Sequence, residues 1–156
     1  MNAPIYQENT SSFIDLRGEI WTTYKSSMEL DTVCHVKINT NSRGVFRGFH
    51  RDPKTTKLSA CISGEILSFV VWPCNTKYKI YELSSAKHSS LIIPPNFYNG
   101  FLSLTESIYI YHLSYTGQYV DASDQSTLTL EDSCIPLQKI DEFYPYASII
   151  RSSRDI

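Results

Sequence analysis

The sequence predicts a mostly β protein, a sandwich or jelly roll in which residues 1–156 form a single domain. Two observations support this fold class. Apolar and polar residues alternate in many short runs, and glycine, proline and asparagine separate these runs at close intervals. The length is enough for one domain with a real core and too short for two ordinary domains.

The N-terminal third begins with a polar stretch and continues with strand-like pieces. Residues 1–12 are predicted to form an arm, and 13–21 two short strands around a turn at Arg17-Gly18. Residues 28–37 alternate and predict another strand, while the polar run 39–44 predicts a turn.

The centre of the chain holds two apolar-alternating runs, 44–49 and 58–71, which flank the polar loop 51–56. Ser63-Gly64 breaks the second run, so we expect neighbouring antiparallel strands. Side chains alternate along a strand, which predicts one face with Phe46, Gly48 and His50 and the other face with Arg47 and Phe49.

The C-terminal half predicts further strands at 78–83, 91–93 and 107–113 and a short one at 128–130, with one or two helical turns within 140–156. Asn99-Gly100 predicts either a type I′ turn or part of a binding site.

Charge and cysteine content narrow the function classes. The net charge of −2 does not indicate a nucleic-acid or membrane partner. The sequence shows neither a signal peptide nor an apolar run of transmembrane length, so we expect a cytoplasmic protein. Four cysteines without a CxxC pair are interpreted as reduced core thiols rather than a disulfide framework (Cys34, Cys61, Cys74 and Cys134).

Three cationic or titratable groups fall close together in the central stretch. They are the guanidinium of Arg47, the imidazole of His50 and the ammonium of Lys57. Imidazole titrates near neutral pH and suits a general base. The alternatives are a structural histidine, an edge-strand lysine that prevents aggregation, and an ion pair of Arg47 with Glu65 or Asp52.

Several motifs in fixed order resemble the dTDP-4-dehydrorhamnose 3,5-epimerase family of cupins. They are DLRG at 15–18, RGVFRGFH at 43–50, KLSACISGEI at 57–66, IPPNFYNGF at 93–101, YIYHLS at 109–114 and SSRD at 152–155. The resemblance covers nearly the whole chain and implies an all-β cupin, a double-stranded β-helix jelly roll, with a short C-terminal helical segment.

The resemblance implies a role for individual residues in inverting carbons next to the ketone of a nucleotide-linked 4-keto-6-deoxy sugar. His50 matches the base, Asp155 the carboxylate that orients it, and Tyr111 the acid on the far side of the ring. Lys57 and Arg47 would stabilise charge at the ketone oxygen or hold a phosphate. The further substrate contacts implied are Arg17, Asn99 and Tyr119, with Asn99 standing where the family has histidine.

The resemblance also implies a homodimer with exchanged N-terminal strands, in which Arg17 reaches the partner's nucleotide. Neither a metal nor an organic cofactor is expected, because the HxH pair of metal-binding cupins is missing at His50-Arg51-Asp52. His35, His88 and His112 match no motif and are interpreted as structural or surface groups.

Two other functions stay open at this point. One is a nucleotide-sugar 3,4-ketoisomerase, which moves the ketone instead of inverting a carbon. The other is a non-catalytic cupin that binds a nucleotide sugar, an alternative that Asn99 favours because an amide does not transfer protons near neutral pH.

Overall fold

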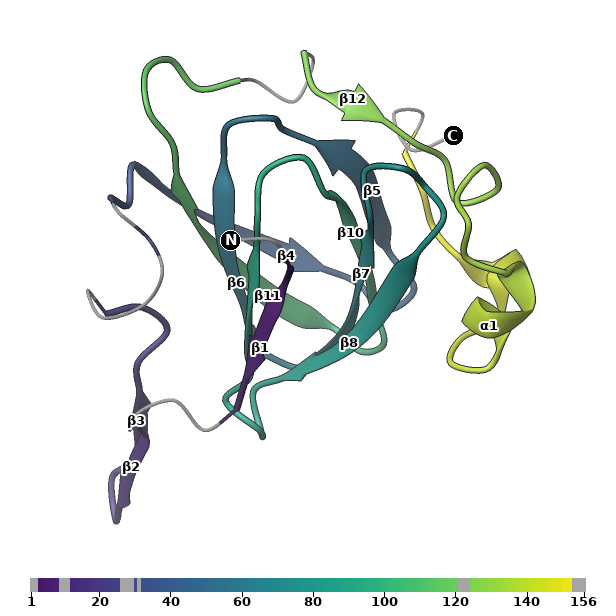
Figure 1. Cartoon of the computed structure of the whole chain (residues 1–156). Coiled ribbons are helices and arrows are strands. Elements are labelled where there is room, and N and C mark those ends of the chain that lie inside the picture. The colour runs from purple at the N-terminus through teal and green to yellow at the C-terminus, as the bar shows by residue number, and fades with distance from the viewer. Residues whose placement is uncertain (1–2, 9–11, 26–29, 31, 121–123, 153–156) are drawn as a thin grey trace.

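A computed structural model describes residues 3–8, 12–25, 30, 32–120 and 124–152 of the chain. Two five-stranded antiparallel sheets face each other, and a two-stranded hairpin extends away from them (Figure 1). The sheets have the orders β1-β9-β6-β11-β4 and β12-β5-β10-β7-β8, and the hairpin is β2-β3. This arrangement confirms the predicted all-β jelly roll.

The strands are short, as the sequence predicts. Their bounds are β1 Ile5–Gln7, β2 Ser12–Asp15, β3 Gly18–Trp21, β4 His35–Asn41, β5 Phe46–Arg51, β6 Thr56–Ser63, β7 Glu65–Val71, β8 Tyr78–Ser84, β9 Ser90–Ile93, β10 Tyr98–Ser103, β11 Ser107–Ser114 and β12 Ser126–Thr127. The predicted C-terminal helical segment is present as the helix α1 Leu137–Asp141 and a 3-10 turn at Tyr146–Ser148, but α1 begins three residues before the predicted range 140–156.

Strand β7 shows why one run of the sequence is apolar at nearly every position. Ile66 and Val70 pack into a cluster with Phe101 and Tyr109, from β10 and β11. The alternate residues of β7 face a second cluster, which α1 and the segments around it cover from outside (Figure 1). Both faces of β7 are therefore buried, so the pattern is continuous instead of alternating.

Three predicted details are wrong. The polar run 39–44 is not wholly a turn, because β4 continues to Asn41. Among the described strands β4 lies at the edge of its sheet, next to β11, and polar residues are tolerated in an edge strand. Of the two alternatives for Asn99-Gly100, the type I′ turn is the one that is wrong, because both residues lie within β10. The predicted strand 128–130 is replaced by β12 just before it.

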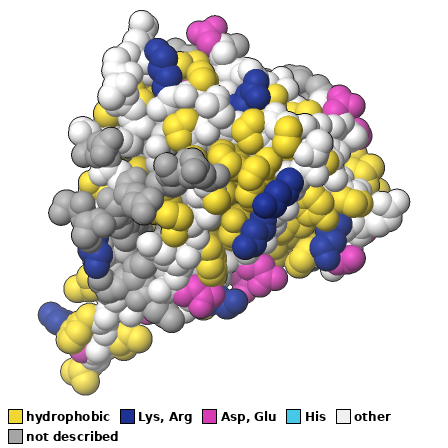
Figure 2. Space-filling view, viewed as in Figure 1, with side chains coloured by type: hydrophobic (Ala, Val, Ile, Leu, Met, Phe, Trp, Pro, Cys, Tyr) yellow, Lys and Arg dark blue, Asp and Glu magenta, His cyan; other side chains and the backbone are white. Residues whose placement is uncertain are grey.

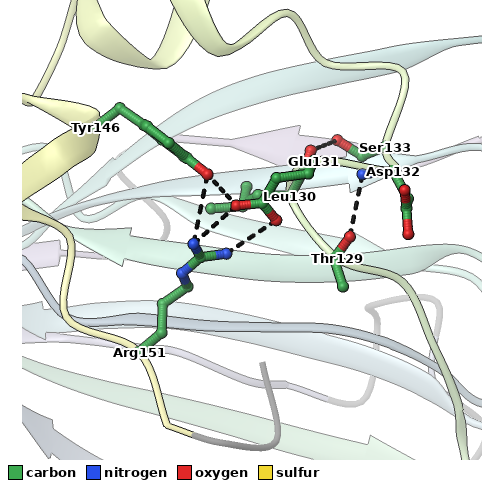
Figure 3. Close-up of polar contacts among 7 residues, drawn as sticks. All are labelled: Thr129, Leu130, Glu131, Asp132, Ser133, Tyr146 and Arg151. Atoms are coloured by element: carbon green, nitrogen blue, oxygen red, sulfur yellow. Dashed lines mark hydrogen bonds and ion pairs between the residues drawn. The ribbon is translucent and has the colours of Figure 1, made fainter. Parts of the chain in front are cut away.

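The last described residues are fixed to the outside of the second sheet. Ile150 exchanges backbone hydrogen bonds with Gly44 and Phe46, next to β5. Arg151 then binds both carboxylate oxygens of Glu131 through its two terminal nitrogens, at 2.8 and 3.1 Å (Figure 3). Tyr146 donates its hydroxyl hydrogen to the same carboxylate. These contacts set where the chain enters the region of the cavity described next.

Candidate active site

A cavity of about 220 Å³ lies between the two sheets, at one end of the strands. Most of the sequence-predicted site residues line it, from both sheets and the loops between them. The lining residues are Lys37, Asn39, Arg47, His50, Asp52, Thr55, Lys57, Ile93, Pro94, Phe97, Asn99, Gly100, Phe101, Tyr109, Tyr111, Leu113, Tyr119, Gln125 and Ser152.

A β-bulge in β5 brings Arg47 and His50 to the same cavity. Asn99 of β10 pairs with His50 and Phe101 pairs with Arg47, so β5 carries one residue more than β10 between these pairs. An extra residue reverses the alternation of side chains beyond it. The predicted faces are therefore wrong: His50 shares the cavity face with Arg47, while Phe49 joins Phe46 in the outer cluster.

Two glycines permit this close approach of β5 and β10. A Cβ on Gly100 would lie 2.7 Å from the carbonyl oxygen of Arg47, and one on Gly48 would lie 2.6 Å from Gly100 Cα. Gly48 also has a φ of +126°, which side-chain-bearing residues rarely adopt. The glycines of the RGFH and NGF motifs are thus required by backbone packing next to the cavity.

Lys57 projects into the cavity from β6, which lies between β9 and β11 inside its sheet. Its ammonium donates to Asn99 Oδ1 at 2.7 Å and lies 4.9 Å from the ring centre of Tyr111. Burial, helped by the charge of Lys37, lowers the pKa of Lys57 from 10.5 to about 8. The edge-strand alternative for Lys57 is therefore wrong.

Asn99 is held by backbone on its other side. Its Nδ2 donates to the carbonyl oxygens of His50, at 3.2 Å, and Phe97, at 3.4 Å. Both donor hydrogens are then used, which leaves the amide oxygen facing the ammonium of Lys57. The asparagine thus links the backbone of the proposed base to the buried cation.

Tyr111 and its neighbour Tyr109 form the wall from β11, opposite β5. Burial raises the pKa of the Tyr111 phenol, and the positive charges of Lys37 and Arg47 act in the opposite direction. Burial raises the pKa of Tyr109 further, in the cluster where its ring packs on Phe101 at 4.4 Å between ring centres. Tyr111 is the phenol with cations around it, and Tyr109 is a core residue.

Arg47 and Tyr119 complete the polar part of the wall. Arg47 Nε donates to Asn41 Oδ1 at 2.8 Å, and within the described part of the chain it forms no ion pair with Glu65 or Asp52. Tyr119 accepts a hydrogen bond from the Lys37 ammonium at 3.2 Å. The ion-pair alternative for Arg47 is therefore wrong.

The charges of the described lining residues do not balance. Lys37, Arg47 and Lys57 are cationic, and Asp52 is the carboxylate among them. Asp52 accepts hydrogen bonds from the backbone N–H of Lys54 and the hydroxyl of Thr55, in its own loop. A cavity with this excess of positive charge suits an anionic substrate or an enolate formed during reaction.

The family model of dTDP-4-dehydrorhamnose 3,5-epimerase matches residues 5–156. The chain belongs to this family. It is therefore a nucleotide-sugar epimerase, an isomerase, which agrees with the resemblance of its motifs. No curated protein matches the chain.

Solved structures of such epimerases share the fold. A dTDP-4-dehydrorhamnose 3,5-epimerase from Sulfolobus tokodaii is 27% identical, with a TM-score of 0.75 over 92% of this chain and 82% of that one. ChmJ, a 3'-monoepimerase from Streptomyces bikiniensis in complex with dTDP-quinovose, is 21% identical, with a TM-score of 0.79 over 98% and 81%. NovW, a 4-keto-6-deoxy sugar epimerase from Streptomyces spheroides, is 18% identical, with a TM-score of 0.72 over 98% and 77%. The last two matches show the cupin jelly-roll fold.

One predicted site residue of this epimerase, Arg17, is not at the cavity, and another, Asp155, lies outside the described residues. Arg17 lies at the turn of the β2–β3 hairpin, where its exposed guanidinium pairs with Asp15 at 2.5 Å, and it is not among the lining residues. Its predicted role across a dimer interface stays a prediction. Asp155 lies outside the described residues, and Ser152 is the last described residue at the cavity.

Sequence reasoning missed Lys37, Asn39, Gln125 and Ser152 as lining residues of the epimerase cavity. Lys37 and Asn39 are two residues apart on β4, so they face the same way. Lys37 ends the predicted strand 28–37, whereas Asn39 falls in the polar run that predicts a turn, so the sequence does not indicate that the two share a face. Gln125 and Ser152 lie in loops, and only the tertiary fold brings them to the site.

The cysteines of the epimerase are free as predicted, but most of them are not core residues. All four cysteines are free, but Cys61 is the one that is buried, and Cys34 and Cys74 are exposed. The prediction of core thiols is therefore right for Cys61 alone. His88 lies 3.0 Å from Glu19, outside the cavity. Across the described ranges, no three His, Cys, Asp or Glu side chains form a metal-binding group, and no helix is long and apolar enough to cross a membrane.

Proposed function

We propose that this epimerase inverts C3, C5 or both carbons of a nucleotide-diphosphate 4-keto-6-deoxy sugar, without a metal or organic cofactor. One observation carries the proposal. An imidazole from one sheet, His50, and a phenol from the facing sheet, Tyr111, line a single cavity with the ammonium of Lys57. Inversion needs a base on one side of the sugar ring and an acid on the other.

His50 removes the proton next to the ketone, and the electron pair of the broken C–H bond moves into an enolate. Lys57 stabilises the enolate oxygen, since its ammonium lies in the cavity and is oriented by Asn99. Tyr111 then donates its hydroxyl proton to the opposite face of the same carbon. The new C–H bond has inverted configuration. The phenolate regains a proton from water, and the imidazolium of His50 releases its proton to solvent, which restores both groups.

The remaining site residues bind the substrate in this proposal. Arg47 and Tyr119 line the cavity and contact the sugar or its phosphates. Asp155 orients the imidazole of His50, as the SSRD motif implies. Asn99 accepts from Lys57, so the amide that replaces the family histidine acts through this lysine and transfers no proton.

We also propose that the enzyme is a homodimer with exchanged N-terminal strands, located in the cytoplasm. The β2–β3 hairpin projects from the barrel, and apolar side chains gather on it at the lower left of Figure 2. Phe13, Ile14 and Ile20 are 60–70% exposed, and Leu16 is fully exposed. Such a patch favours burial by a partner chain, and it would carry Arg17 with it.

Light scattering tests the dimer. We expect a mass of twice 17.8 kDa for the unmodified chain and a monomer for Ile20→Asp, which places a charge in the hairpin patch. A monomeric unmodified chain would contradict the proposal. Lys79→Met, an exposed change on β8, is the control that leaves the mass unchanged.

Proton NMR in D₂O tests the chemistry, with dTDP- and GDP-linked 4-keto-6-deoxyhexoses as substrates. Deuterium at C3 and C5, absent with a folded His50→Ala variant, supports a 3,5-epimerase with His50 as the base. Deuterium at one carbon narrows the activity to a single centre, and movement of the ketone indicates the ketoisomerase alternative. Absence of exchange with every substrate would refute the proposed function.

A further inference from the structure

Lys37 is a lysine of the cavity to which no motif assigns a role. It lies on the edge strand β4 and pairs in register with Tyr111 of β11. Its ammonium donates to the hydroxyl of Tyr119 at 3.2 Å and lies 4.5 Å from the centre of that ring. Tyr119 thus holds the end of Lys37 at the cavity wall, beside the strand that carries Tyr111.

Tyr111 has cations on more than one side. Lys57 of β6 lies over its ring at 4.9 Å, and Lys37 of β4 is its register partner on the opposite strand. Both positive charges act on a phenol whose surroundings are otherwise apolar on the side of Tyr109 and Phe101. Among the described residues, the charged and titratable groups that face Tyr111 are Lys37 of β4, Arg47 of β5, Lys57 of β6, Tyr109 of its own strand and Tyr119 of the following loop.

We propose that Lys37 is a positioning residue that supplies the counter-charge for the phenolate left when Tyr111 gives up its proton. This inference rests on the proposed function, in which Tyr111 is the acid. The Tyr111 O–H bond breaks, the proton forms the new C–H bond, and the electron pair stays on the phenolate oxygen. Lys37 then faces a new negative charge at the cavity wall, and solvent water later returns the proton.

Lys57 stabilises the enolate oxygen in the same reaction, so an enzyme with Lys57 alone would stabilise the enolate at least as well as the phenolate. While the enolate is present, Lys57 is engaged with one negative charge. When the proton moves from Tyr111 to carbon, the negative charge moves from the enolate to the phenolate. A second cation on the phenol side makes this transfer more favourable. Electrostatics agree, since the charge of Lys37 opposes the effect of burial on the pKa of Tyr111.

The first experiment needs no substrate. NMR of protein labelled with [ζ-¹³C]tyrosine follows each phenol across the alkaline range, and Tyr111→Phe identifies the Tyr111 signal. We expect Lys37→Met to move the Tyr111 titration to higher pH and Lys37→Arg to keep it near that of the unmodified protein. Lys79→Met is the matched control, since Lys79 lies 5.1 Å from the ring of Tyr81 outside the cavity. A Tyr111 titration unchanged in Lys37→Met would overturn the inference.

The second experiment measures turnover. We expect Lys37→Met to lower kcat by about tenfold with KM within about twofold, the order expected when one nearby opposite charge is removed. Lys37→Arg should restore most of kcat because it keeps the charge. A rise in KM with kcat unchanged would overturn the inference. If the unmodified protein epimerises no nucleotide sugar, the proposed function fails, while the phenol titration still decides whether Lys37 stabilises the phenolate.

Discussion

The buried ammonium of Lys57 is predicted to lower the unfolding free energy of the protein. Burial lowers its pKa from 10.5 to about 8, so keeping it charged in the folded protein at neutral pH costs about 3 kcal/mol. This is an upper limit because the cavity admits water. Lys57→Met removes the cost but leaves Asn99 Oδ1 without its donor, which offsets about 1 to 3 kcal/mol. We expect a folded, inactive variant at least as stable as the unmodified protein at pH 7.

The difference in unfolding free energy between Lys57→Met and the unmodified protein should also depend on pH. Between pH 8 and 10.5 the unfolded chain binds a proton at Lys57 that the folded chain has lost, so the unfolding free energy of the unmodified protein rises with pH there. Lys57→Met lacks this gain. The advantage of the variant should therefore shrink by about 2 to 3 kcal/mol between pH 7 and 10.

Urea unfolding at both pH values measures this difference, and other titrating groups cancel because the two proteins share them. Lys79→Met is the control, since Lys79 is exposed on β8 and its variant should differ from the unmodified protein equally at both pH values. A Lys57→Met difference that stays constant with pH would refute the account of Lys57 as a desolvated cation.

Two further predictions concern the outer face of the second sheet and the approach of β5 to β10. The ion pair with Arg151 lowers the pKa of Glu131 from 4.5 to about 2, so the stabilisation by this pair is present above pH 4.5 and is lost as the pH falls toward 2. Because the pair is partly exposed, Glu131→Gln should lower the unfolding free energy by no more than about 1 kcal/mol at pH 7. A difference in urea unfolding between the two proteins that does not change with pH would contradict this. Gly100→Ala should lower the unfolding free energy by about 1 to 3 kcal/mol and reduce turnover, since its Cβ would meet the Arg47 carbonyl oxygen; an unchanged urea midpoint would contradict the close approach of β5 and β10.

The sequence was sufficient for the fold class and for the residue types of the site. Alternation in β11 and the continuous apolar run of β7 follow directly from one-sided and two-sided burial. His50, Lys57 and Tyr111 were found through motifs, and all three line the cavity. Their roles in the reaction stay predictions.

The wrong predictions concern features that depend on how two strands pair, which the sequence of one strand does not show. The faces of β5 depend on a bulge relative to β10, and neither strand alone shows how many residues the other has opposite it. Asn99-Gly100 has the composition of a turn, yet Gly100 is needed because the backbone of β5 passes next to it. Lys37 falls at the end of the predicted strand 28–37, but no motif includes it, so the sequence indicates no site role for it.

The proposal that His50 and Tyr111 act on opposite faces of the sugar is tested most directly by comparing His50→Asn with Tyr111→Phe in D₂O. We predict that the unmodified enzyme both labels and inverts the carbon. Tyr111→Phe should label it with retained configuration, because His50 still removes and returns a proton on its own face. His50→Asn should do neither. Inversion at the normal rate by Tyr111→Phe, or labelling by His50→Asn, would contradict the account.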